Sequence, residues 1–221
     1  MSDRLARRSS WPVPVALVAL SAIPLAAGTL RLVQLSGGPD VLPADDRFAG
    51  FPLALVVHIL GAATYAVIGT LQFVPRFRRR HRSWHRRAGR VLAVAGLLVA
   101  ASALWLTLGY APKAGTGGLL FVLRLVFASG MAACLLLGYA AARRHEFSTH
   151  RAWMIRAYAI GLAAGTQAFT EGFGGALVGT GELRDDLLKG AGWVINLAVA
   201  EWVIGHRQVK PAAPLSGSAA R

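Results

Sequence analysis

Long apolar runs alternate with short polar segments along the whole chain. A helix that crosses a bilayer needs about 20 mostly apolar residues, and a chain in lipid must satisfy its backbone hydrogen bonds internally. The pattern therefore predicts an all-α fold, a polytopic membrane bundle of about six transmembrane helices. The predicted spans are residues 11–35, 50–74, 91–110, 118–142, 152–177 and 188–205.

Polar segments lie at both ends of the chain. Residues 1–10 are basic, and residues 206–221 are rich in Pro, Ala and Ser, a composition expected to be disordered. A basic start followed by an apolar run also resembles a signal peptide. The run at 11–35 is longer than the usual signal core of about 7 to 15 residues, so we expect a retained helix.

The composition excludes an ordinary soluble domain, because 55% of the residues are hydrophobic and only 15% are charged. The net charge of +14 raises the question of nucleic acid. The basic residues, however, lie in short segments between apolar runs, which is typical of cytoplasmic loops and not of a nucleic-acid surface. We therefore expect no nucleic acid, and a lipid bilayer whose anionic headgroups contact the basic loops.

The distribution of Lys and Arg predicts the orientation. With the amino terminus in the cytoplasm, 18 of the 24 Lys and Arg residues lie on the inner side. The opposite orientation would place those 18 outside, against the positive-inside rule. We therefore expect a multi-pass protein of the bacterial cytoplasmic membrane with both termini inside.

Two basic segments share the same order of residue types: Arg-Arg-His, a short gap, then His-Arg, and later one more arginine. These positions are 79–81, 85–86 and Arg90 in the first segment, and 143–145, 150–151 and Arg156 in the second. One interpretation is a duplicated two-helix hairpin that forms a four-helix core, with the first and last spans peripheral. The other is chance, because Arg-rich loops draw on few residue types.

These segments also carry a resemblance. The stretch that begins at His58 and contains LQFVPRFRRRHRSWHRRAGRV and HRAWMIRAYA resembles the bacterial multi-pass membrane proteins of domain-of-unknown-function family 2306. The resemblance covers roughly residues 50–205. It implies an integral membrane location and a helical bundle, and it implies no catalytic role. The matching residues are Gln72-Phe73, His85-Arg86, Gly89-Arg90, His150-Arg151, Trp153-Met154 and Arg156.

The basic segments provide the first candidate site. His85 and His150 are expected at matching depth on neighbouring helices, where two imidazoles can hold the iron of a b-type haem. The same side chains could instead hold a quinone or a divalent metal, or simply cap helix ends among lipid headgroups. Two further histidines, His81 and His145, lie in the same segments. The arginines that could pair with haem propionates are Arg86, Arg151 and Arg156.

A second group of polar residues lies deeper in the predicted spans, nearer the outer side. His58, Arg124 and Glu171 fall at comparable depth, at 1.5 Å per helical residue. Charged groups inside a span are costly and usually face a partner or a polar cavity, so we expect Arg124 to interact with Glu171, close to His58, Gln167 and Thr170. The group is either a proton or small-molecule transport site or a polar lock that fixes helix order.

Three functions remain open: a haem- or quinone-linked redox protein, a transporter, and a structural membrane protein. The repeated histidines favour the first. No phosphate-binding loop, nucleophile elbow or metalloprotease motif supports a soluble-type enzyme. The single cysteine, Cys134, excludes an intrachain disulfide. Glu201 is expected to pair with a loop arginine, and the oligomeric state is left open, a homo-oligomer included.

Overall fold

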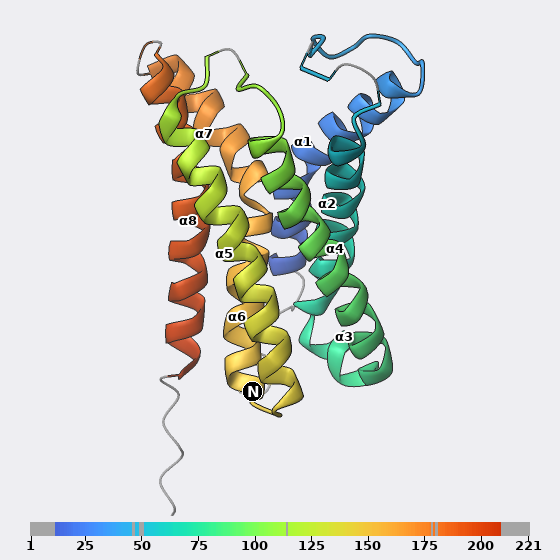
Figure 1. Cartoon of the computed structure of the whole chain (residues 1–221). Helices are drawn as coiled ribbons and strands as arrows, with labels where there is room; N and C mark the ends of the chain where they lie inside the picture. The colour runs from blue at the N-terminus through green and yellow to red at the C-terminus, as the bar shows by residue number, and fades with distance from the viewer. Residues whose placement is uncertain are drawn as a thin grey trace, which may run out of the picture.

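The computed structural model describes residues 12–208 except 46, 49–50, 114, 178 and 180. This part of the chain folds into eight α-helices and contains no strand, which confirms the all-α prediction (Figure 1). The predicted basic segment 1–10 and most of the predicted tail lie outside the described residues. The helices are α1 (Pro12–Leu35), α2 (Leu53–Gln72), α3 (Pro75–Arg80), α4 (Arg82–Leu108), α5 (Gly118–Arg143), α6 (Phe147–Gly161), α7 (Ala163–Leu177) and α8 (Glu182–Gln208).

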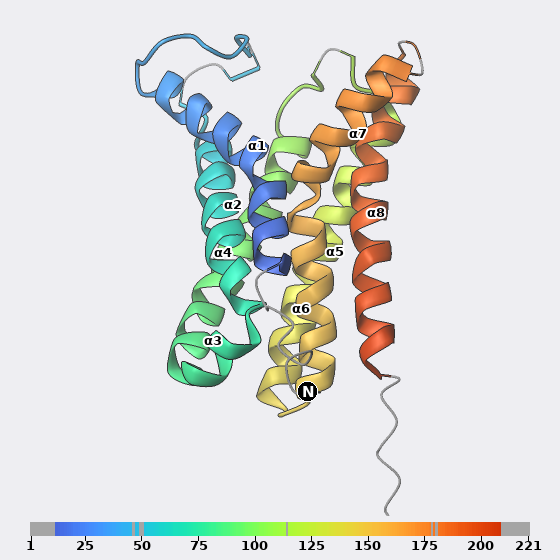
Figure 2. The same cartoon turned by 180° about the vertical axis from the view of Figure 1, so that it is seen from behind.

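The chain passes along the bundle six times. Five helices of the described part, α1, α2, α4, α5 and α8, are long and apolar enough to cross a membrane. The remaining pass is divided into α6 and α7, which follow one another along the bundle (Figures 1 and 2). The break is a single residue: the Leu162 amide still donates to the Tyr158 carbonyl at 3.0 Å. Just beyond it, a Cβ on Gly165 would lie 2.1 Å from the Leu20 carbonyl oxygen, so α7 passes against the backbone of α1.

Several helices extend beyond the apolar runs into the polar segments. Helix α4 begins at Arg82, inside the first basic segment, and α8 begins at Glu182, ahead of the apolar run that starts at residue 188. Leu, Arg, Lys and Glu are good helix formers in water as well as in lipid. The acidic residues Glu182 and Asp185 in the first turn of α8 also suit its positive amino end. At the other end, α8 includes residues 206–208, so these are helical and not part of a disordered tail.

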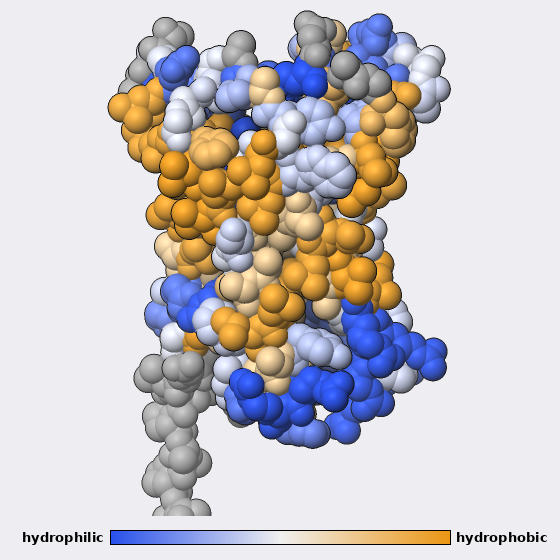
Figure 3. All heavy atoms as spheres, in the orientation of Figure 1, coloured by the Kyte–Doolittle hydropathy of each residue, from blue (hydrophilic) through white to orange (hydrophobic). Residues whose placement is uncertain are grey.

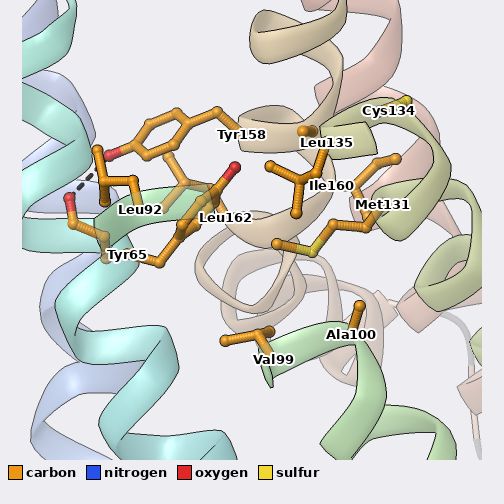
Figure 4. Packing of buried hydrophobic residues seen from close by; sticks show 12 residues of the cluster. Tyr65, Leu92, Val99, Ala100, Met131, Cys134, Leu135, Tyr158, Ile160 and Leu162 are labelled. Atoms are coloured by element: carbon orange, nitrogen blue, oxygen red, sulfur yellow. Dashed lines mark hydrogen bonds between the residues drawn. The ribbon is translucent and has the colours of Figure 1, made fainter. Parts of the chain in front are cut away.

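Helices α2, α4, α5 and α6 enclose the core, and α1 and α8 lie outside them, as the duplicated hairpin predicts. The Tyr65 ring fills the space left by two glycines, since a Cβ on Gly96 would lie 2.8 Å from it and one on Gly161 3.0 Å. Figure 4 shows this packing. The buried cluster comprises Tyr65 and Ala66 of α2; Leu92, Val99 and Ala100 of α4; Met131, Cys134 and Leu135 of α5; Ala157, Tyr158 and Ile160 of α6; and Leu162.

The surface divides into an apolar band and two polar ends (Figure 3). Large apolar side chains such as Val94, Val126 and Trp202 are about 60% exposed around the band. Apolar surface this extensive is expected to face lipid. We call the end that carries α3 and the turn between α5 and α6 the basic end. The opposite end carries the described residues of the segments 36–52, 109–117 and 178–181.

Candidate functional site

His85 and His150 occupy equivalent positions at the basic end. The first hairpin consists of α2 and α4, and the second consists of α5 and α6. Each histidine lies near the start of the second helix of its hairpin, and its Nδ1 contacts the first helix. The His85 Nδ1 contacts the Gln72 Oε1 at the end of α2. The His150 Nδ1 lies 2.8 Å from the Gly138 carbonyl oxygen of α5. The two hairpins therefore share a histidine contact as well as a sequence pattern.

These contacts set the tautomer of each ring in its neutral form. A carbonyl oxygen only accepts, so the His150 Nδ1 carries the proton and donates it to Gly138. The same arrangement holds for His85 when the Gln72 oxygen accepts. Each Nε2 then carries the lone pair that a metal needs. Neither Nε2 makes a hydrogen bond to the described residues.

His81 and His145 do not join this pair through any contact among the described residues. Both are exposed and lie in the turns that precede α4 and α6. The His81 ring packs on Phe77 at a centroid distance of 4.8 Å. His145 has a positive φ of 63°, and its ring meets Phe147 edge-on at 5.9 Å. These two histidines form the turns, and they are too exposed to act as buried ligands.

The candidate arginines have different surroundings. Arg156 donates to both Glu201 oxygens, at 2.5 and 2.8 Å, and its guanidinium lies 4.9 Å from the centre of the Trp153 ring. This pair connects α6 to α8 and confirms that Glu201 meets an arginine. Arg86 is exposed on α4, and Arg151 is half-buried on α6. Arg78 of α3 was not a candidate, but it lies close enough to His85 to act on its charge.

At the opposite end, the predicted pair of Arg124 and Glu171 is wrong. Glu171 forms its ion pair with Lys189, whose Nζ lies 3.0 Å from the Glu171 Oε2. Lys189 lies in α8, which packs against α7, and it meets Glu171 there. The apolar pattern does not contain the rotation of one helix against the other, so the contact could not be anticipated.

Other polar side chains of α7 bind the backbone of α8. Gln167 donates to the Lys189 carbonyl at 2.9 Å, and Thr170 donates to the Leu188 carbonyl at 2.7 Å. One turn further along, the Thr166 hydroxyl lies 2.7 Å from the Asn196 Oδ1. Because each of these groups already has a partner on α8, their geometry favours a polar lock between the two helices.

His58 is separate from that lock. Its Nδ1 lies 3.1 Å from the Ser102 hydroxyl and 3.3 Å from the Val99 carbonyl, both on α4. No contact among the described residues joins it to Arg124, Glu171 or Gln167. The predicted intramembrane site is therefore divided: His58 connects α2 to α4, and Gln167 and Glu171 connect α7 to α8.

Asp186 was missed by the sequence reasoning. Its side chain is 1% exposed and accepts hydrogen bonds from two backbone amides at the start of α5, Gly117 at 3.1 Å and Leu120 at 2.9 Å. An amino-terminal cap normally comes from the same helix. Here it comes from α8, 66 residues further along the chain than Leu120, and no local pattern could reveal it.

The candidate residues include too few metal-binding side chains in one place for a dedicated metal site. Among the described residues, no group of three or more His, Cys, Asp or Glu side chains is placed to hold a metal ion. His85 and His150 are the predicted ligands that the fold holds at equivalent positions of the two hairpins.

Six apolar passes, a buried core and polar ends define a polytopic helical membrane protein. Residues 55–204 match the family described as "Predicted membrane protein (DUF2306)", and the chain belongs to this family. The matched region contains both hairpins, the Asp186 cap and nearly all of α8. No curated protein matches the chain, and no solved structure does.

Proposed function

We propose that the protein is a membrane redox protein that holds a b-type haem between His85 and His150. One observation carries the proposal: each ring is held through Nδ1 by the first helix of its hairpin, at equivalent positions of the two hairpins, and neither Nε2 has a partner among the described residues. Haem-ligating histidines commonly need such an oriented ring, because the bond at the second nitrogen sets the tautomer and the direction of the lone pair.

The number of available ligands favours haem over a divalent metal. A haem iron needs two axial ligands from the protein, whereas a tetrahedral zinc site needs three or four. Bound haem would supply one-electron transfer at the membrane surface. Arg86 of the first basic segment and Arg151 of the second are the arginines that we propose to lie at its propionates. A quinone bound by the same imidazoles and arginines would serve the same redox role.

We also infer that the basic end faces the cytoplasm of a bacterial cell, with anionic lipid at its rim. The support is the charge distribution, because the two basic segments at that end, residues 76–90 and 143–156, hold eight and four arginines. Transport has less support than redox, because the residues proposed for it are distributed over separate helix contacts.

The absorption spectrum of the purified protein in detergent tests the proposal. Protein from haem-sufficient cells, or protein incubated with haemin, should show a Soret band that His85→Ala and His150→Ala each abolish. His81→Ala and His145→Ala are matched controls, because they remove the exposed histidines of the same two hairpins and should keep the band. Circular dichroism checks that each variant remains helical.

Removal of the acceptor gives a second test. Gln72→Leu leaves both ligands in place and removes the oxygen that orients His85, so haem affinity should fall by about 10- to 100-fold, the usual effect of such a supporting contact. A colourless protein under both loading conditions would overturn the haem proposal. A band that is retained in both alanine variants would overturn the assignment of His85 and His150.

A further inference from the structure

A cavity of about 220 Å³ opens at the opposite end of the bundle, remote from the histidine pair. It lies between the end of α4, the start of α5 and the segment 36–52. Liquid water occupies about 30 Å³ per molecule, so the space equals about seven waters and suits a small solute. The lining residues are Arg47, Leu106, Thr107, Tyr110, Ala111, Pro112, Thr116, Gly117, Gly118, Phe121 and Arg124.

The charge of this lining is one-sided, because it contains two arginines and no acidic residue. Arg47 is neutralised by Asp45, which accepts two hydrogen bonds from it at 2.7 and 2.6 Å. Arg124 is half-buried near the end of a membrane helix and forms no ion pair with the described residues. A buried charge without a partner is costly in a membrane protein.

The acidic side chains that act on Arg124 have other direct partners. Glu171 pairs with Lys189, and Asp186 is hydrogen-bonded to the amides of Gly117 and Leu120. Both carboxylates act on the Arg124 charge from a distance, but neither makes a direct contact with it. Because Asp186 also accepts from two of the amides at the start of α5, the guanidinium of Arg124 is the charged group of the lining left to receive an anion.

We propose that this cavity binds a small oxyanion, a carboxylate or a phosphate group, with Arg124 as its principal contact. Arg47 adds a second guanidinium, and the Tyr110 hydroxyl is a further donor in the lining. Phe121 and Leu106 provide an apolar wall for a short carbon chain. A soluble anion and the headgroup of an anionic lipid share this chemistry. The site does not depend on the proposed haem.

Thermal unfolding of the full chain in dodecyl maltoside tests the site. Inorganic phosphate and succinate are titrated at constant ionic strength with chloride, and phosphatidylglycerol is titrated into the micelles in a separate arm. Wild type should be stabilised in at least one arm. Arg124→Gln should weaken the apparent affinity by about tenfold or more, as expected for the loss of a charge-assisted contact. Lys113→Gln is the matched control, because it removes a cation of the adjoining turn that does not line the cavity.

The pattern of responses identifies the ligand source. Stabilisation by phosphate or succinate indicates a soluble anion, whereas stabilisation by phosphatidylglycerol alone indicates a lipid headgroup. Either result supports the site when Arg124→Gln reduces it and Lys113→Gln does not. Absence of stabilisation in every arm overturns the proposal, as does equal binding by wild type and Arg124→Gln. If Arg124→Gln does not fold, Arg47→Gln and Tyr110→Phe provide the same comparison. None of these outcomes depends on haem loading.

Discussion

Substitution of Asp186 by alanine should destabilise the bundle far more than any neighbouring acidic substitution. The side chain is 1% exposed and joins α8 to the start of α5 through two backbone amides, those of Gly117 and Leu120. The substitution would therefore leave two buried N–H donors without an acceptor.

The magnitude follows from these contacts. A hydrogen bond to a charged group contributes about 1.5 to 3 kcal/mol, and loss of a helix cap typically costs about 1 kcal/mol. Because the two bonds share one carboxylate and are not additive, we expect Asp186→Ala to lower the free energy of unfolding by about 2 to 4 kcal/mol. Gly117→Ala should act in the same direction, because its new Cβ would lie 2.6 Å from the Asp186 Oδ2.

Reversible unfolding in mixed dodecyl maltoside and dodecyl sulfate micelles, followed by circular dichroism, measures this loss. Asp185→Ala is the matched control: it removes the same side chain one position earlier, where the carboxylate is 34% exposed and pairs only with Arg184. Exposed ion pairs contribute about 0 to 1 kcal/mol. Equal losses for Asp185→Ala and Asp186→Ala would refute the cap as an energetic link between α5 and α8.

Two further predictions concern the core and the loop 36–52. Tyr158→Phe should lower the free energy of unfolding by about 1 kcal/mol, because it removes the buried bond at 2.8 Å to an α2 carbonyl; the exposed Tyr139→Phe should have no effect in the same unfolding assay. The hydrogen bond from Arg47 lowers the pKa of Asp45. The contact therefore stabilises the loop fully at pH values above the ordinary Asp pKa of about 3.9, and this stabilisation is lost as the pH falls through the lowered pKa. An NMR titration of the Asp45 carboxyl should shift upward in Arg47→Gln, and an unchanged midpoint would contradict the contact.

The comparison of pattern and structure is most informative at the histidines. The repeated Arg-Arg-His and His-Arg order predicted that His85 and His150 would occupy matching positions, and each ring contacts the first helix of its hairpin through Nδ1. The same pattern treated His81 and His145 as equivalent candidates, but these form exposed turns. Sequence spacing identifies residues that share a loop. It does not show which of them point into a packed hairpin.

For the polar residues within the spans, the sequence predicted the depth but not the contacts. Depth along a helix can be counted from the sequence, and it placed Arg124, Glu171 and His58 at a similar level. Which of them meet depends on how each helix is rotated and on which helices are neighbours. The depth of a residue along its helix contains neither kind of information. Glu171 therefore meets Lys189, and His58 meets α4.

The sequence by itself determined that this is an all-helical, multi-pass membrane protein with one strongly basic end, because long apolar runs have few other stable solutions in lipid. It also indicated the family, which the match over residues 55–204 confirms. The tertiary structure decided the surroundings of the polar groups: the capping of α5 by Asp186, the lock between α7 and α8, and the place of Arg124 in the lining of a cavity. The physical reason is the distance over which each effect acts. Burial in lipid acts on each segment alone, whereas a hydrogen bond or an ion pair needs two side chains within about 3 Å, and only the packed helices bring them there.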